Sequence, residues 1–155
     1  MATNRLPLNC LPIMFRGLRL SDLPRLCEIE RECFKDPWPR EWFRALILSR
    51  MLVWGACSSG KIAGYLVALL SSDQIHLANI ATDEQYRRQG IARRLLERLY
   101  EYAGRNGQER IVLEVRPSNH DAISLYAAEG FVQIGIKQGY YRGKEDALIY
   151  SLELK

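Results

Sequence analysis

The sequence lacks the residue spacings that hold structural metals or disulfide frameworks. Its 155 residues include four cysteines and two histidines, and no Cys-x-x-Cys pair occurs among them. We therefore expect no metal site. The four cysteines, Cys10, Cys27, Cys33 and Cys57, are expected to be reduced thiols, as is usual in a cytoplasmic protein. The histidines, His76 and His120, are interpreted as surface or capping residues without partners.

Long apolar runs are also missing. Residues 6–15 are apolar, but Pro7 and Pro12 interrupt them, which argues against a cleaved signal peptide. No other run approaches the roughly 20 apolar residues that a membrane-spanning helix needs. We expect a soluble protein with no membrane partner.

Two common phosphate-binding loops are absent as well. No Gly-x-x-x-x-Gly-Lys-Ser/Thr occurs, so a P-loop nucleotide site is not expected. No Gly-x-Gly-x-x-Gly follows a predicted strand, so a nicotinamide or flavin site is not expected either.

The composition is that of an ordinary globular domain. A net charge of +4 and a pI of about 9.0 are too moderate to indicate a direct nucleic-acid partner. Residues 1–12 contain two prolines and no periodicity, so we expect a flexible tail there. Residues 13–155 suit one hydrophobic core, and we expect a single domain and a monomer.

Hydrophobic periodicity predicts an α/β fold. Apolar segments predict strands over residues 13–20, 51–57, 61–70, 74–82, 110–115, 131–137 and 147–154. Helical spacing predicts helices from Ser21 to about residue 34, and over about 39–47, 89–103 and 119–129. We expect a mixed, mostly antiparallel sheet of about seven strands with helices on both faces.

Glu30 falls on the apolar face of the first predicted helix, beside Leu26, Cys27 and Phe34. Because unpaired glutamates are rarely buried, the favoured interpretation places its carboxylate at the rim, in water. The alternative is a carboxylate that faces a substrate cleft.

The segment 87–92, Arg-Arg-Gln-Gly-Ile-Ala, joins the strand at 74–82 to the longest predicted helix. The first N–H groups of a helix have no partner within it, and the helix dipole adds positive charge there. Gly90 lets the backbone approach a ligand closely. These features predict a pyrophosphate site, although a solvated helix start would look similar.

Several motifs follow one another along the chain at residues 21–24, 37–38, 79–81, 86–92, 113–116, 118–119, 122–126, 129–131, 140–141 and 145–147. Their order and spacing resemble the N-acetyltransferases of the GNAT family, in the branch that modifies protein N-termini. The resemblance covers almost the whole chain. It implies the GNAT fold, acetyl-CoA as co-substrate and acetyl transfer to an amine.

Such a reaction needs a base, because an α-amine with a pKa of about 8 is mostly an ammonium near neutral pH. Glu114 lies in an apolar strand, where desolvation is expected to raise its pKa toward the working range. The resemblance assigns Glu114 the proton-acceptor role and makes Tyr126 the proton donor to the coenzyme A thiolate. The alternatives are an outward-facing Glu114 in an ion pair and a Tyr126 that only packs in the core.

The resemblance also implies the coenzyme contacts. The backbone of Ile80, Ala81 and Thr82 would pair with the pantetheine arm like an extra strand. The pyrophosphate would be bound by Arg88, Gln89, Gly90, Ile91, Ala92 and Arg93. Asn119 matches a residue that contacts the coenzyme, though helix capping alone would explain it.

Three aromatic residues are expected at the acceptor site. Trp38 lies between two predicted helices, and Tyr140 and Tyr141 lie in a predicted loop over residues 138–146. That loop resembles the aromatic loop of N-terminal acetyltransferases, which closes over the first residues of a peptide. The resemblance implies a protein N-terminal peptide with a small first residue, Ala, Ser or Thr, and makes a small-subunit ribosomal protein a candidate. Alternatively, these aromatics only pack.

Two other functions stay open at this point. The same fold could acetylate a lysine side chain or a small amine. In another class, the chain could be a non-catalytic acyl-CoA sensor or a basic RNA-associated module. Glu114 and Tyr126 together argue against a sensor, which would need neither.

Overall fold

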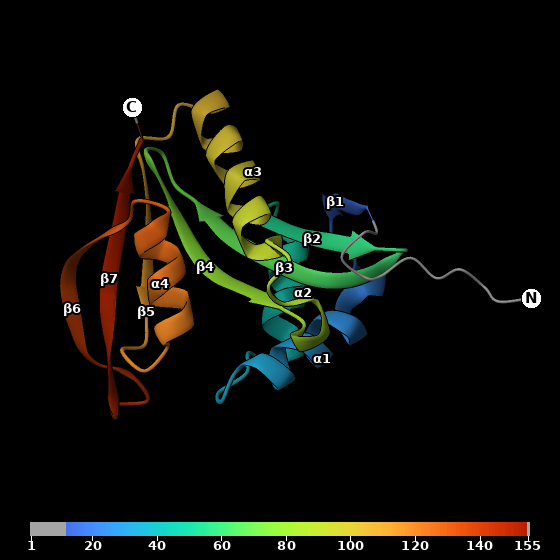
Figure 1. Cartoon of the computed structure of the whole chain (residues 1–155), viewed down its shortest axis with the longest axis horizontal. Helices are drawn as coiled ribbons and strands as arrows, with labels where there is room; N and C mark the ends of the chain where they lie inside the picture. Colours follow the sequence, from blue (N-terminus) through green and yellow to red (C-terminus); the bar gives the residue numbers. More distant parts are fainter. Residues whose placement is uncertain (1–11, 155) are drawn as a thin grey trace, which may run out of the picture. The chain divides into compact units, whose positions relative to one another are not determined.

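The computed structural model describes residues 12–154. Its strands are β1 (Ile13–Gly17), β2 (Leu52–Ser58), β3 (Lys61–Leu70), β4 (Gln74–Thr82), β5 (Arg110–Val115), β6 (Val132–Tyr141) and β7 (Glu145–Glu153) (Figure 1). Its α-helices are α1 (Leu23–Cys33), α2 (Arg40–Leu48), α3 (Ile91–Arg105) and α4 (His120–Ala128). Residues 12–154 also contain the short 3-10 helices η2 (Leu20–Asp22) and η3 (Glu84–Tyr86). Within this part of the chain, no helix is long and apolar enough to cross a membrane.

The strands form one sheet in the order β1-β2-β3-β4-β5-β7-β6. Antiparallel pairing joins β1 to β2, β5 to β7 and β6 to β7, whereas β4 and β5 are parallel. The predicted mixed sheet of seven strands with flanking helices is confirmed.

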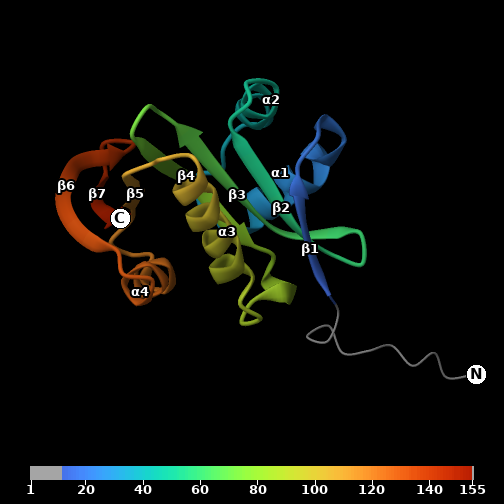
Figure 2. The ribbon, with the colours of Figure 1, turned by 90° about the horizontal axis from the view of Figure 1, so that it is seen from above.

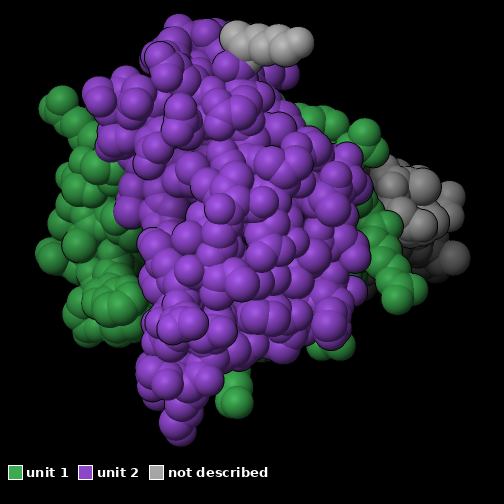
Figure 3. Space-filling model, turned by 90° about the vertical axis from the view of Figure 1, so that its left-hand side faces the viewer, with its two compact units in different colours: residues 1–67, 79–97 green, residues 68–78, 98–155 purple. Residues whose placement is uncertain are grey.

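The chain divides into two compact units, which Figure 3 colours separately. The described part of unit 1 comprises residues 12–67 and 79–97, and that of unit 2 comprises residues 68–78 and 98–154. The prediction of a single domain over residues 13–155 stays a prediction. Apart from residue 12, the predicted tail over residues 1–12 lies outside the described residues.

In unit 1, α1 and α2 lie on one face of the strands and the first turns of α3 on the other (Figure 2). β3 is buried from Ile62 to Ala68, as expected for a strand that is apolar on both faces. Gly64 lets β3 and β4 approach closely, because a Cβ there would lie 2.9 Å from the carbonyl oxygen of Ala81. This contact places the end of β4 against the core.

In unit 2, α4 packs on one face of β5 and β7 (Figure 2). Burial alternates along β5, so Leu113 and Val115 point into the core. Glu114 points to the opposite face of the sheet. The carboxylate is therefore kept out of the hydrophobic core by strand geometry alone.

The prediction of a loop over residues 138–146, with Tyr140 and Tyr141 in it, is wrong. β6 continues to Tyr141, and β7 begins at Glu145. Arg142 and Gly143 both have positive φ (53° and 71°), and the Lys144 N–H donates to the Tyr141 carbonyl at 3.0 Å. Because Tyr141 pairs with Glu145 across the hairpin, only the three residues 142–144 connect the strands, and no longer loop is present.

The helix starts also differ slightly from the predictions. Ser21 lies within η2, and Asp22 is the N-cap residue of α1, so the predicted Ser21 cap is wrong. Asp22 instead accepts hydrogen bonds from Arg16 (2.7 and 2.9 Å) and from the Arg19 N–H (2.8 Å). That network ends β1 at Gly17 and turns the chain into the helix.

Candidate active site

The segment that precedes the predicted coenzyme loop is anchored by Asp83, in unit 1. Its carboxylate accepts the Gln85 N–H at 2.9 Å at the start of η3, and Arg25 of α1 pairs with the same side chain. Burial raises the pKa of Asp83, but these hydrogen bonds outweigh it, so the pKa lies below its usual value. The ionised carboxylate therefore ties α1 to the turn that leads into α3.

The backbone of the predicted pyrophosphate loop contains two left-handed residues, Arg88 (φ 63°) and Gly90 (φ 73°). α3 then begins at Ile91, and the Gly90 carbonyl accepts the Arg94 N–H at 3.0 Å. Apart from Gly90 itself and its two chain neighbours, no described residue has an atom within 4 Å of the point where a Cβ on Gly90 would stand. The loop thus offers unobstructed backbone at a helix N-terminus, as anion binding requires.

The predicted pantetheine strand is the last part of β4. The register of β4 with β5 covers Gln74, Ile75 and His76. Ile80, Ala81 and Thr82 lie further along the same strand, in unit 1. The Thr82 carbonyl accepts the Arg87 Nε–H at 3.3 Å, so the loop and the strand end are joined directly.

Glu30 lies at the centre of a buried cluster in unit 1, and only 1% of its surface is exposed. The carboxylate accepts hydrogen bonds from the Trp38 N–H (2.9 Å), the Asn79 side-chain amide (2.9 Å) and the Tyr65 hydroxyl. The interpretation that placed Glu30 at a rim in water is therefore wrong. Three donors from separate segments replace the water that a buried carboxylate would lose.

Trp38 lies on the loop between α1 and α2, as the two flanking prolines predicted. The centroid of its ring lies 5.3 Å from the ring centroid of the buried Phe43 and 5.9 Å from that of Trp42. Phe43 in turn packs edge-on against Tyr65, with ring centroids 5.8 Å apart. Backbone and ring contacts together hold this loop in place.

Glu114 in unit 2 is paired through both carboxylate oxygens. His76 Nε2 contacts Oε2, and Lys137 Nζ lies 2.9 Å from Oε1. The hydrogen bond from His76, followed by that from Lys137, outweighs desolvation and lowers the pKa of Glu114 to about 2. The expected upward shift of this pKa is therefore wrong, because the strand geometry gives the carboxylate two donors.

Sequence reasoning missed His76 and Lys137 at this site, and the interpretation of His76 as a partnerless surface residue is wrong. The parallel register sets His76 opposite Val112, which makes Glu114 its diagonal neighbour on the same face. Pairing the two predicted strands in parallel could have found this contact. The Lys137 contact also depends on how β6 and β7 pair, which no local motif indicates.

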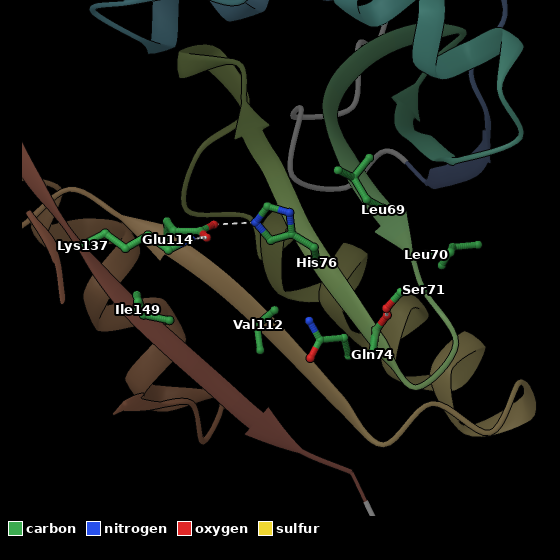
Figure 4. A pocket seen from close by; sticks show the side chains of 9 residues that line it. All are labelled: Leu69, Leu70, Ser71, Gln74, His76, Val112, Glu114, Lys137 and Ile149. Atoms are coloured by element: carbon green, nitrogen blue, oxygen red, sulfur yellow. Dashed lines mark hydrogen bonds and ion pairs between the residues drawn. The ribbon is translucent and has the colours of Figure 1, made fainter. Parts of the chain in front are cut away.

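A cavity of about 430 Å³ opens beside this carboxylate in unit 2 (Figure 4). It is lined by Leu69, Leu70, Ser71, Gln74, His76, Val112, Glu114, Lys137 and Ile149. The ionic groups gather at one end and aliphatic side chains form much of the wall. Such a cavity could admit a small polar group and the chain attached to it.

Tyr126 is buried in α4, and its ring centroid lies 5.5 Å from that of Phe131. Burial raises the pKa of Tyr126 well above its usual value, and the neighbouring Tyr141 adds to the effect. The hydroxyl therefore keeps its proton at neutral pH and is available as a donor. Packing and proton donation are compatible, as the sequence interpretation allowed.

Tyr140 and Tyr141 lie at the end of β6 with their ring centroids 4.9 Å apart, edge to face. The Arg116 guanidinium stacks 4.0 Å from the Tyr141 ring, and Lys137 Nζ lies 5.3 Å from the Tyr140 ring. Burial, with a smaller contribution from Tyr140, raises the pKa of Tyr141 to about 12. Both tyrosines thus belong to the same charged neighbourhood as Glu114.

Asn119 is the N-cap residue of α4, and its side-chain oxygen accepts the Ala122 N–H at 3.3 Å. The capping role is therefore present. Among the predicted residues, Trp38 and the coenzyme set from Ile80 to Arg93 belong to unit 1. The others, Glu114, Asn119, Tyr126, Tyr140 and Tyr141, belong to unit 2.

Comparison with known proteins identifies this combination of features. The model of the acetyltransferase (GNAT) family matches residues 23–131, which contain the Gly90 loop, Glu114 and Tyr126. Glu30 and its three hydrogen-bond donors fall within the same range.

Two curated relatives resemble the chain over most of its length. The ribosomal protein bS18-alanine N-acetyltransferase of Escherichia coli (strain K12) is 36% identical over 141 residues, which cover 89% of this chain and 95% of the relative. A putative enzyme of the same name from Bacillus subtilis (strain 168) is 34% identical over 137 residues, covering 86% and 91%.

The fold agrees with a solved structure as well. The crystal structure of the ribosomal-protein-S18-alanine N-acetyltransferase from Escherichia coli matches with a TM-score of 0.85 at 35% identity, covering 93% of this chain and 95% of that one. The expected resemblance is thereby confirmed. The chain belongs to the acetyltransferase (GNAT) family.

Proposed function

We propose that this protein transfers the acetyl group of acetyl-CoA to the N-terminal amine of a ribosomal protein whose first residue is small. The observation that carries the proposal is the 36% identity to the Escherichia coli alanine N-acetyltransferase, across 95% of that enzyme. Similarity over the full length includes the acceptor side of the fold as well as the coenzyme loop. Ribosomal proteins are made in the cytoplasm, so the reaction would take place there.

Acetyl-CoA would bind along β4 and at the start of α3. The pyrophosphate lies against the loop from Arg88 to Arg93, where the positive φ of Gly90 opens the backbone. The pantetheine arm pairs with the backbone of Ile80, Ala81 and Thr82, which lie beyond the register of β4 with β5. Asn119 contributes a further contact from the cap of α4.

Glu114 is proposed as the base that takes the proton from the acceptor amine, directly or through one water. Because its pKa is held near 2, the side chain is fully ionised at neutral pH and attracts an ammonium group. Lys137 Nζ, 2.9 Å from Oε1, is already a primary ammonium in this position. A peptide N-terminus carries the same charged group and would compete for the same oxygen.

Tyr126 is proposed as the acid that protonates coenzyme A when the tetrahedral intermediate collapses. Its raised pKa keeps the hydroxyl protonated until a thiolate forms nearby. Trp38, Tyr140 and Tyr141 are proposed to line the acceptor peptide. The stacked Arg116 and the tight hairpin hold the tyrosine pair in one orientation.

The test is a peptide series assayed for coenzyme A release and, by mass spectrometry, for the position of the acetyl group. A bS18 peptide that begins with Ala should be acetylated only on its α-amine. Matched peptides begin with Ser, Thr, Met or Leu, and one has a blocked N-terminus and an internal lysine. If the blocked peptide reacts as fast as the Ala peptide, the acceptor is a lysine and the proposal is wrong.

A further inference from the structure

The carboxylate proposed as the base has a lysine beside it that lines the same cavity. Lys137 of β6 places Nζ 2.9 Å from Oε1 of Glu114 (Figure 4), and His76 contacts the other oxygen, Oε2. The side chain of Lys137 is 50% exposed, whereas that of Glu114 is 12% exposed. An amine that approaches the carboxylate at Oε1 therefore also meets the lysine ammonium.

Lys137 can serve a second acceptor at this place. Its ammonium has three N–H groups, and a carboxylate oxygen can accept more than one hydrogen bond. Among the described residues that line the cavity, Lys137 is the only lysine or arginine. The ring centroid of Tyr140, which is proposed to line the acceptor peptide, lies 5.3 Å from Nζ. A peptide held by that tyrosine would thus pass close to the ammonium.

The first residue of a peptide carries two polar groups at a nearly fixed distance. Its amine nitrogen and its carbonyl oxygen are joined through Cα and lie about 3 Å apart. Oε1 of Glu114 and Nζ of Lys137, 2.9 Å apart, present the complementary pair: an acceptor for the amine and a donor for the carbonyl oxygen. A lysine side chain offers only the amine, because a four-carbon stem separates it from the backbone.

We propose that Lys137 binds the carbonyl oxygen of the acceptor's first residue, and that Glu114 and Lys137 together select an α-amine over a lysine side chain. This inference rests on the proposed function and names the residue that determines its class of acceptor. Glu114 keeps its role as the base. Lys137 takes no proton: by binding the carbonyl it holds the amine beside the carboxylate in one orientation.

The first test compares three matched acceptors in the wild type. One is the Ala peptide, and in the second a CH=CH group replaces the first peptide bond, which removes the carbonyl oxygen but keeps the shape. The third is the matching ester, which keeps the carbonyl oxygen and lacks the N–H. The alkene should lose about tenfold in kcat/KM, the low end for a hydrogen bond to a charged group, because Lys137 is half exposed. The ester should stay within about threefold of the peptide.

The second test measures the peptide-to-alkene ratio of kcat/KM in variants. Lys137→Met has no donor, so the preference for the peptide should fall below about twofold, whereas Lys137→Arg should keep most of it. Any effect of the substitution on the basicity of Glu114 or on folding acts on both acceptors and cancels in the ratio. The control is Lys61→Met, at the exposed first residue of β3, which should keep the wild-type ratio.

A competition between two amines gives a third measure. The Ala peptide is offered together with the peptide that has a blocked N-terminus and an internal lysine. Lys137→Met should reduce the preference for the α-amine by about tenfold, because only the α-amine substrate loses a contact.

The outcomes separate this inference from the proposed function. If the wild type treats the alkene and the peptide alike, or if Lys137→Met keeps the wild-type preference, Lys137 does not bind the carbonyl, and N-terminal acetylation stands. The wild-type comparison decides the question even if the Lys137→Met protein does not fold. A wild-type protein that acetylates no peptide N-terminus would overturn both.

Discussion

Replacing Glu30 should reveal how much one buried carboxylate contributes to this fold. The side chain accepts three hydrogen bonds, from the Trp38 N–H, the Asn79 amide and the Tyr65 hydroxyl. Glu30→Leu keeps the approximate size but leaves these donors without an acceptor. Each orphaned buried donor costs about 1–3 kcal/mol, so the free energy of unfolding should fall by about 3–6 kcal/mol once local rearrangement is allowed for.

Glu30→Gln is the graded comparison. A glutamine oxygen can accept from some of the three donors, but its NH₂ group meets at least one donor unless Asn79 rotates its amide. The expected loss is about 1–3 kcal/mol, roughly one mismatched hydrogen bond. The control is Glu28→Gln on the same helix. The exposed Glu28 carboxylate lies 3.2 Å from Arg25, and this pair should contribute less than about 1 kcal/mol.

Urea denaturation followed by far-UV circular dichroism measures these losses, with the m-value as a check on two-state behaviour. The peptide KM should rise in both Glu30 variants, because the Trp38 loop loses its backbone anchor. If Glu30→Leu unfolds within 0.5 kcal/mol of the wild type, as ordinary surface substitutions do, the three contacts do not stabilise the fold and the reasoning fails.

Three further predictions concern the coenzyme loop and the site in unit 2. Gly90→Val should weaken acetyl-CoA binding at least tenfold by calorimetry, because valine adds bulk and backbone strain at a residue with a φ of 73°. The control is Gly107→Val, after α3, where φ is 67°. It introduces the same backbone strain but should bind acetyl-CoA normally. Equal affinities would contradict the loop assignment. Tyr126→Phe should lower kcat about 10–10²-fold without changing the Kd for acetyl-CoA, and an unchanged kcat would exclude Tyr126 as the acid. The last prediction concerns pH. Because the folded structure depresses the pKa of Glu114 to about 2, the ionised carboxylate contributes its full share to the free energy of unfolding above the usual pKa of 4.5. That contribution is lost as the pH falls toward 2. The unfolding free energies of the wild type and of Glu114→Gln should therefore converge as the pH falls from 4.5 toward 2. If the two plots of unfolding free energy against pH stay parallel, Glu114 is not paired with His76 and Lys137 in solution.

Local patterns in the sequence were sufficient for most of the fold. Apolar runs and helical spacing place the sheet strands, because burial requires a period of 2 or 3.6 residues wherever an element meets the core. The Gly90 loop and the Asn119 cap could be recognised for the same reason, since their chemistry depends on neighbours along the chain. Even so, the hairpin after Tyr141 was missed, because Arg142 supplies a left-handed residue that sequence preference does not suggest.

Only the tertiary structure decided the states of two carboxylates, the buried Glu30 and the partly buried Glu114. Glu30 accepts from residues 8, 35 and 49 positions away, and Glu114 accepts from His76 and Lys137 on two other strands. From the sequence, apolar neighbours implied a water-exposed rim for Glu30 and a raised pKa for Glu114. Both inferences were wrong for one physical reason: the free energy of a buried charge depends on the donors that surround it in space, and strand register and loop closure bring those donors together.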